Sequence, residues 1–144
     1  MSNLLALPLI ALTIETGNNE DWIDSIVYVV DTEGMTPEDS PQLDLRGITF
    51  EMEVRRNAGD AEVIVAASTA SGSLRIGDPP NYGFLLFNLL LPDMQRIRAG
   101  SYVADVTGRD GQNVRRVISI SQLTIVEGVT KQPVNRRVIV QAAA

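Results

Sequence analysis

Hydrophobic and polar side chains alternate with a period of two along much of this 144-residue chain. The clearest case is ITFEMEVRR, residues 48–56, in which four apolar side chains alternate with polar ones. Successive side chains of a β-strand point to opposite faces, so this pattern predicts a strand with one buried and one solvated face. EVIVAAS, residues 62–68, follows the turn NAGD and is expected to be its hairpin partner, with Val63, Val65 and Ala67 facing inward.

Further strands are expected wherever short apolar or alternating runs are bounded by turn residues. They cover residues 9–17, 22–30, 74–76, 82–91, 102–107 and 114–126. The run YGFLLFNLLL is apolar on both faces, so it is either a central strand covered on both sides or a strand whose outer face meets another protein. In the last run the apolar phase shifts by one residue, which predicts a β-bulge near Ser121 and Gln122.

One helical turn and one hairpin connect the later strands. Pro92 suits the first turn of a short helix, and Gly100 is expected to terminate it. Tyr102 comes just afterwards, where sandwiches of the immunoglobulin type often place a tyrosine whose hydroxyl bonds to the preceding loop. In the following turn, Asp110-Gly111 favours a positive φ at Gly111.

The expected fold class is an all-β, antiparallel, immunoglobulin-like β-sandwich of seven or eight strands with one short helical turn and extended terminal arms. A small closed barrel is the alternative. We expect an N-terminal arm over residues 1–9, the sandwich over 10–130 and a C-terminal arm over 131–144, with both arms docked on neighbouring subunits. The arm residues expected at these interfaces are Leu4, Leu5, Leu7, Leu9, Ile10, Val134, Val138, Ile139 and Val140.

Composition excludes several classes of chemical site. The chain has no histidine and no cysteine, which removes histidine-based acid–base catalysis and nucleophile activation, disulfides, thiolate metal sites and most zinc sites. Its formal net charge of −6 argues against binding to a phosphate backbone. The run LLALPLIAL resembles the apolar part of a signal peptide, but it lacks a preceding basic residue and is too short for a membrane span. We therefore expect no cofactor, no nucleic acid and no membrane among its ligands.

Three weaker candidates for chemistry remain. The acidic loop 31–39 could supply oxygen ligands to calcium, although the EF-hand spacing is absent. Trp22, Tyr28 and Tyr82 could form a stacking platform for a sugar, but widely separated aromatics are more often core or interface residues. Asp105 is disfavoured in the middle of a strand, so it faces water, pairs with Arg115 or Arg116, or bonds backbone groups. An enzyme would require two carboxylates facing each other in a pocket.

The chain resembles a family of small virion proteins from tailed bacteriophages and prophages, and in particular the N-terminal immunoglobulin-like domain of the phage upper baseplate protein. The resemblance covers about residues 43–130 and consists of an L-D-L-x-G strand entry, an F-x-M-x-V-R strand, a Gly-x-Tyr-x-x-Asp strand and a G-V-T close. The matching residues are Leu43, Asp44, Leu45, Gly47, Phe50, Met52, Val54, Arg55, Gly100, Tyr102, Asp105, Gly128, Val129 and Thr130. Ala104 and Lys131 depart from this pattern. The pattern as a whole is typical of a β-sandwich and does not indicate an active site.

The resemblance implies a non-enzymatic structural component of a virion, made in the cytoplasm of a bacterial host. It is consistent with a tail, baseplate, neck, fibre-adaptor or head-decoration subunit whose partners are copies of itself and other virion proteins. Strand addition and arm contacts would join such subunits. A carbohydrate-binding or host-adhesion module that takes a surface glycan is the alternative, and it requires an exposed aromatic cluster.

Overall fold

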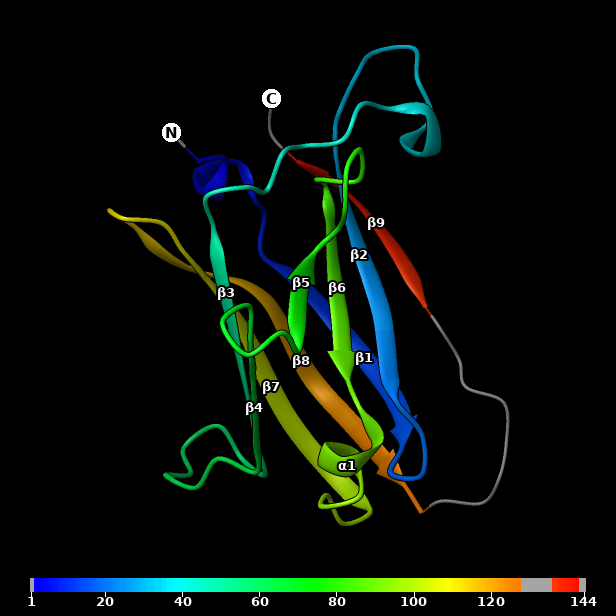
Figure 1. Cartoon of the computed structure of the whole chain (residues 1–144), viewed down its shortest axis with the longest axis vertical. Helices are drawn as coiled ribbons and strands as arrows, with labels where there is room; N and C mark the ends of the chain where they lie inside the picture. Colours follow the sequence, from blue (N-terminus) through cyan, green and yellow to red (C-terminus); the bar gives the residue numbers. More distant parts are fainter. Residues whose placement is uncertain (1, 128–135, 143–144) are drawn as a thin grey trace.

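Two β-sheets pack face to face in the computed structural model of the chain, which describes residues 2–127 and 136–142 (Figure 1). The all-β sandwich with one short helical turn is confirmed. Nine strands lie within the described ranges: β1 (Ile10–Gly17), β2 (Trp22–Val30), β3 (Thr49–Arg55), β4 (Val65–Ser68), β5 (Leu74–Ile76), β6 (Phe84–Leu89), β7 (Gly100–Arg109), β8 (Val114–Val126) and β9 (Arg137–Ala142). The helical pieces are η1 (Leu4–Ala6), η2 (Pro37–Asp39) and α1 (Leu91–Met94).

The strand order is that of an immunoglobulin-type sandwich with one replacement. Sheet A has the order β1-β8-β7-β3-β4, and sheet B has the order β5-β6-β2-β9. Strands β2, β6 and β5 correspond to B, E and D of an immunoglobulin domain, and β3, β7 and β8 correspond to C, F and G. Beside β2, the place of strand A is taken by the C-terminal strand β9. Both β1–β8 and β2–β9 are parallel pairs, so the expected antiparallel sheets are in fact mixed.

The core lies between the sheets and is filled by the alternating residues of the strands. Phe50, Met52 and Val54 are buried, as the alternation in β3 predicts. Trp22 packs its ring edge-on against Phe87 at a centroid distance of 5.3 Å. The interior is therefore closed by aromatic and aliphatic contacts.

The connection from sheet B to sheet A is fixed by a tyrosine, as the sequence predicts. Helix α1 begins with Pro92 in its first turn, and the Tyr102 hydroxyl donates a 2.6 Å hydrogen bond to the Arg98 carbonyl. Gly100 does not terminate α1, which ends at Met94; it lies at the start of β7 with a φ of +154°. The predicted bulge is confirmed, because Ser121 falls at a register shift that β8 shows to both of its neighbours.

Two local predictions on the hairpins are wrong. Gly111 has no positive φ; the turn is held by Asp110 Oδ1, which accepts the backbone N–H groups of Gln112 and Asn113 at 2.8 Å. Val63 lies before β4 and is 37% exposed, so it is not an inner-face residue. A carboxylate that caps the turn removes the need for a left-handed glycine.

No helix in the described part of the chain is long and apolar enough to cross a membrane.

Candidate functional site: the terminal segments and sheet edges

The N-terminal segment packs onto its own sandwich. Leu4 and Leu7 are 0% and 1% exposed and belong to the main core. Gly108 of β7 leaves the space for Leu4, because a Cβ at Gly108 would lie 2.8 Å from Leu4 Cδ1. The expectation that both leucines reach out to a neighbouring subunit is therefore corrected: they close one end of their own core.

Polar contacts hold the same segment against the β7–β8 hairpin. The Ser2 hydroxyl donates to Asp110 Oδ2 at 2.5 Å, and Arg115 donates from its guanidinium to the Leu5 carbonyl at 2.8 Å. The Ser2 hydroxyl and the two turn N–H groups lower the pKa of the Asp110 carboxyl below its ordinary value. The long β7–β8 hairpin thus serves as the docking surface for the start of the chain.

The outward side of the N-terminal segment remains exposed. Leu5 is 63% exposed and Leu9 is 50% exposed, whereas Ile10 is half-buried in β1. Strand β1 is an edge of sheet A, with β8 as its only strand neighbour among the described residues. Of the interface residues predicted in this segment, Leu5 and Leu9 are the two that a partner could contact directly.

The C-terminal strand also belongs to the sandwich, which corrects the expected arm over 131–144. Strand β9 runs parallel to β2, with Ser25 opposite Arg137 and Val30 opposite Ala142. Val140 is buried, and Val138 and Ile139 are half-buried. Val134, the remaining predicted interface residue, lies outside the described residues.

The start of β9 is fixed by a buried carboxylate that the sequence analysis missed. Asp24 is 4% exposed; its Oδ1 accepts the Arg136 backbone N–H at 2.7 Å, and its Oδ2 accepts the Trp22 indole N–H at 2.7 Å. The Arg136 guanidinium lies 3.7 Å from Asp24 Oδ2 and also donates to the Glu15 carbonyl of β1. We call Trp22, Asp24 and Arg136 the β9 clasp. An aspartate in the apolar strand WIDSIVYVV was the available signal.

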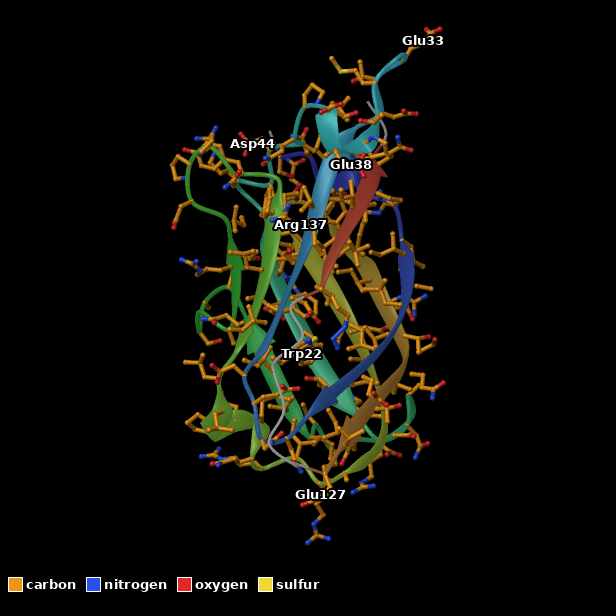
Figure 2. All side chains as sticks on the ribbon, turned by 90° about the vertical axis from the view of Figure 1, so that its right-hand side faces the viewer. Trp22, Glu33, Glu38, Asp44, Glu127 and Arg137 are labelled. Carbon is orange, nitrogen blue, oxygen red and sulfur yellow. The ribbon has the colours of Figure 1, made fainter. Side chains whose placement is uncertain are left out.

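Strands β1 and β9 lie on the same side of the sandwich, which faces the viewer in Figure 2. Each is the last strand of its sheet, and an edge strand presents backbone N–H and C=O groups that no strand of the sheet satisfies. The end of β9 and the helix η1 lie at the same end of the molecule (Figures 1 and 2). The edge strands β1 and β9 therefore lie on one side of the sandwich, and the N-terminal segment lies at one end of it.

The outer face of sheet B is partly apolar. In β6 the inward residues Leu85, Phe87 and Leu89 are buried, whereas the outward Phe84 and Leu86 are half-buried. The Arg137 guanidinium of β9 lies 5.3 Å from the centre of the Phe84 ring. A shallow hollow of about 130 Å³ lies here between β9 and the loop that carries Glu38, and Figure 2 labels both Glu38 and Arg137 on this side. The run YGFLLFNLLL, which is apolar on both faces, thus packs in the core on one face and is only partly covered on the other.

A broad groove of about 860 Å³ lies on the outer face of sheet A. Glu53 and Asp105 stand directly opposite each other in it, on β3 and β7. Each has its own arginine: Arg55 lies 2.5 Å from Glu53, and Arg116 lies 3.7 Å from Asp105. Both carboxylates are about half exposed, at 51% and 50%. Both carboxylates are solvated and each is paired with its own arginine, so they lack the desolvation and mutual contact that tune paired carboxylates for acid–base catalysis.

The three aromatic residues suggested as a sugar platform do not come together. Trp22 and Tyr28 are buried in the core, where burial raises the pKa of the Tyr28 hydroxyl well above its ordinary value. The Tyr82 ring is covered by the Arg46 guanidinium at 3.9 Å, and Arg46 is paired in turn with Asp44 at 2.7 Å. A flat face on which a sugar ring could stack is therefore not available from these residues.

The acidic loop extends away from the sandwich, and Glu33 lies at its tip (Figure 2). Within residues 2–127 and 136–142, no three carboxylates are grouped closely enough to hold a metal ion. Asp39 instead accepts a 2.9 Å hydrogen bond from the Thr36 hydroxyl, next to the short helix η2. Loop 31–39, which the structure describes in full, thus offers no cluster of calcium ligands.

No protein-family model matches this sequence, and a search of curated proteins finds no match either.

Proposed function

We propose that this protein is a non-enzymatic structural subunit of a bacteriophage virion that joins copies of itself and other virion proteins through the edge strands β1 and β9 and the exposed side chains of the N-terminal segment. The observation that carries the proposal is the position of β1 and β9: one edge strand of each sheet lies on the same side of the sandwich. Strand addition at such edges gives affinity through backbone hydrogen bonds.

The polar side chains with specific contacts support a structural role. Asp24 holds β9, Tyr102 fixes the crossover and Asp110 holds both its own turn and Ser2. Each of these groups satisfies a backbone or side-chain partner within the fold. They stabilise segments of the chain instead of lining a cavity in which a substrate could react.

The assignment to a virion rests on the resemblance of residues 43–130 to the immunoglobulin-like domain of phage baseplate proteins. Two of the matched residues have structural tasks consistent with that pattern: Tyr102 bonds to the preceding loop, and Asp105 pairs with Arg116. In this proposal the chain is made in the cytoplasm of the bacterial host and becomes part of the particle. Repeated copies would convert weak edge contacts into a stable assembly.

The experiment is to sediment lysate from the bacterium that encodes the protein and to follow the chain by quantitative mass spectrometry. The proposal predicts that the chain sediments with phage-sized particles at a fixed ratio to their other proteins and stays bound in high salt. A chain that remains in the supernatant while particles sediment would contradict it. A glycan array tests the adhesion alternative. That alternative requires an exposed aromatic cluster, which Trp22, Tyr28 and Tyr82 do not form.

A further inference from the structure

The edge strands of the two sheets are protected to different degrees. Strands β4 and β5 have four and three residues, and a short edge strand offers few groups to pair with. Beside β9 lies the loop of residues 31–39, where Asp31 Oδ1 accepts a 3.4 Å hydrogen bond from the Gln141 side chain. Strand β1 has eight residues, and the run LIALTI, residues 9–14, carries no charge. Strand β1 is therefore the least protected of these edges.

The second half of β1 is closed by side chains of its own chain. The Glu15 carbonyl accepts a hydrogen bond from the Arg136 guanidinium, and the Gly17 N–H donates to Glu20 Oε1 at 3.1 Å. Both backbone groups lie on the edge of β1 that faces away from β8. Another strand could not bond to them without displacing these side chains.

The first half of β1, residues 10–13, has no such cover. Alternate residues of a parallel ladder bond to the neighbouring strand, so Ala11 and Thr13 direct their N–H and C=O groups the same way as Glu15. The register shift does not interrupt this alternation, because the extra residue is Ser121 of β8. In the part of the chain that the structure describes, neither Ala11 nor Thr13 bonds to a group outside the β1–β8 ladder. This edge faces the viewer in Figure 2 and can accept another strand.

The open half is complementary to itself in the antiparallel direction. If Leu12 lies opposite Leu12 of a second copy, Ala11 of each copy lies opposite Thr13 of the other. Residues opposite each other in this way exchange both of their backbone hydrogen bonds. The register centred on Leu12 therefore satisfies the open N–H and C=O groups of Ala11 and Thr13 in both copies.

The side chains fit the same register. Ile10 and Leu12 pack against the core but are only half-buried, whereas Ile14 is 5% exposed. In the pair, Ile10 lies opposite Ile14 on the inner face, and apolar cross-strand pairs of this kind are stabilising. Glu15 lies opposite the uncharged Leu9, so no like charges face each other. The strand with the best fit to this edge is thus the same strand of another copy.

We propose that two copies of this chain pair edge to edge through the first halves of their β1 strands, antiparallel and centred on Leu12. The pair is two-fold symmetric and joins two five-stranded sheets A into one continuous sheet. The inference rests on the proposed assembly role and specifies the partner, a second copy, and the element that joins the two. A single short strand pair buries little area, so repeated contacts within a particle are what make it stable.

Disulfide trapping reports the register directly, because the chain has no cysteine of its own. Ala11→Cys and Thr13→Cys place thiols at exposed positions that the pair brings directly opposite each other. Within one variant, the two equal positions are offset by two residues, about 7 Å along the strand, which is too far for a disulfide. The matched control is Ala66→Cys with Ser68→Cys, which have the same spacing on β4, the opposite edge of the same sheet.

The two full-length variants of each set are mixed in equal amounts at high concentration, oxidised and separated on a non-reducing denaturing gel. The proposal predicts a covalent dimer in the first mixture, linked between positions 11 and 13 in peptide mapping. Ala11→Cys or Thr13→Cys alone should give little dimer, and the β4 mixture should remain monomeric. A first mixture that links no better than its single variants, or no better than the β4 mixture, would overturn the proposal.

A charge on the open edge provides an independent test. Thr13→Lys adds the kind of side chain that protects natural edge strands, at an exposed position. Circular dichroism and thermal unfolding should be unchanged, whereas the oligomer mass in light scattering should fall toward that of one chain. An oligomer whose mass Thr13→Lys does not lower would overturn the β1 pair.

Sedimentation with phage particles separates this failure from failure of the proposed function. A chain that sediments with particles but forms no 11–13 link would refute the β1 pair and leave assembly through another surface. A chain that forms the 11–13 link but never sediments with particles would support the β1 pair and contradict the virion role.

Discussion

The N-terminal segment and strand β9 are held in different ways, although both were expected to dock on neighbouring subunits. The N-terminal segment is held by side chains: Leu4 and Leu7 enter the core, and Leu4 fills the space beside Gly108. Strand β9 is held by its backbone ladder to β2, by the clasp at Arg136 and by the buried Val140 and Ala142. The N-terminal segment thus depends on leucines fitted to particular places in the core, whereas β9 depends on a backbone ladder as well as on side chains.

The largest expected effect is on the β9 clasp. Asp24→Ala leaves the Trp22 indole and Arg136 without their carboxylate, and breaking a buried pair of this kind costs about 3 kcal/mol or more. Urea unfolding should show this loss, and hydrogen exchange should speed up in residues 137–142. Asp105→Ala is the control, since its pair with Arg116 is half exposed and contributes under about 1 kcal/mol. If Asp24→Ala and Asp105→Ala are equally stable, the clasp does not stabilise the fold.

The next effect distinguishes the two faces of the N-terminal segment. Leu4→Ala should destabilise the protein by about 3 kcal/mol, because a buried leucine loses its contacts and leaves a cavity. Leu5→Ala, at a side chain that is 63% exposed, should change the unfolding midpoint very little. The comparison fails if Leu4→Ala is as stable as Leu5→Ala, because the segment would then not be part of the cooperative core.

A smaller effect is expected where the structure fixes the crossover between sheets. Tyr102→Phe removes the hydrogen bond to the Arg98 carbonyl and should lower the free energy of unfolding by about 1 kcal/mol. Tyr82→Phe makes the same chemical change at a surface ring and should leave stability nearly unaltered. Thermal unfolding of both variants measures the difference, and a neutral Tyr102→Phe would show that the crossover is fixed by packing alone.

The smallest effect is the pH dependence of N-terminal docking. The pKa of Asp110 is lowered in the folded protein, so its bond to Ser2 contributes stability above the ordinary value of 3.8. That contribution is lost as the pH falls through the lowered pKa. Carboxyl NMR titration should show the Asp110 pKa rising toward its ordinary value in Ser2→Ala. An identical titration in both proteins would mean that Ser2 does not bind Asp110 in solution.

Local sequence patterns predicted the main structural features of β3, β7 and β8. The alternation in residues 48–55 reports which face of β3 is buried, and the phase change in β8 reports the bulge at Ser121. Tyr102 was predictable because a tyrosine directly after a crossover turn has its bonding partner only a few residues away. Each of these features is decided by contacts that are close in sequence or by a strict period of two.

The ends could not be predicted in the same way, because their partners are far away in sequence. Leu4 depends on the small size of Gly108, and Arg136 depends on a carboxylate 112 residues earlier. An apolar terminal run has the same pattern whether it covers its own domain or a neighbour. Asp24 was overlooked for a related reason: its place in an apolar strand signals a buried partner without identifying that partner.

Self-assembly through the edges β1 and β9 is tested by the mass of the full-length protein in solution, measured by light scattering over a wide concentration range. We predict a mass that rises from that of one 15.7 kDa chain to that of a dimer or larger assembly as concentration increases. Asp24→Ala should alter that rise, because it removes the clasp that fixes β9. A single-chain mass at every concentration, for the unmodified protein and the variant alike, would contradict self-assembly through the β1–β9 side.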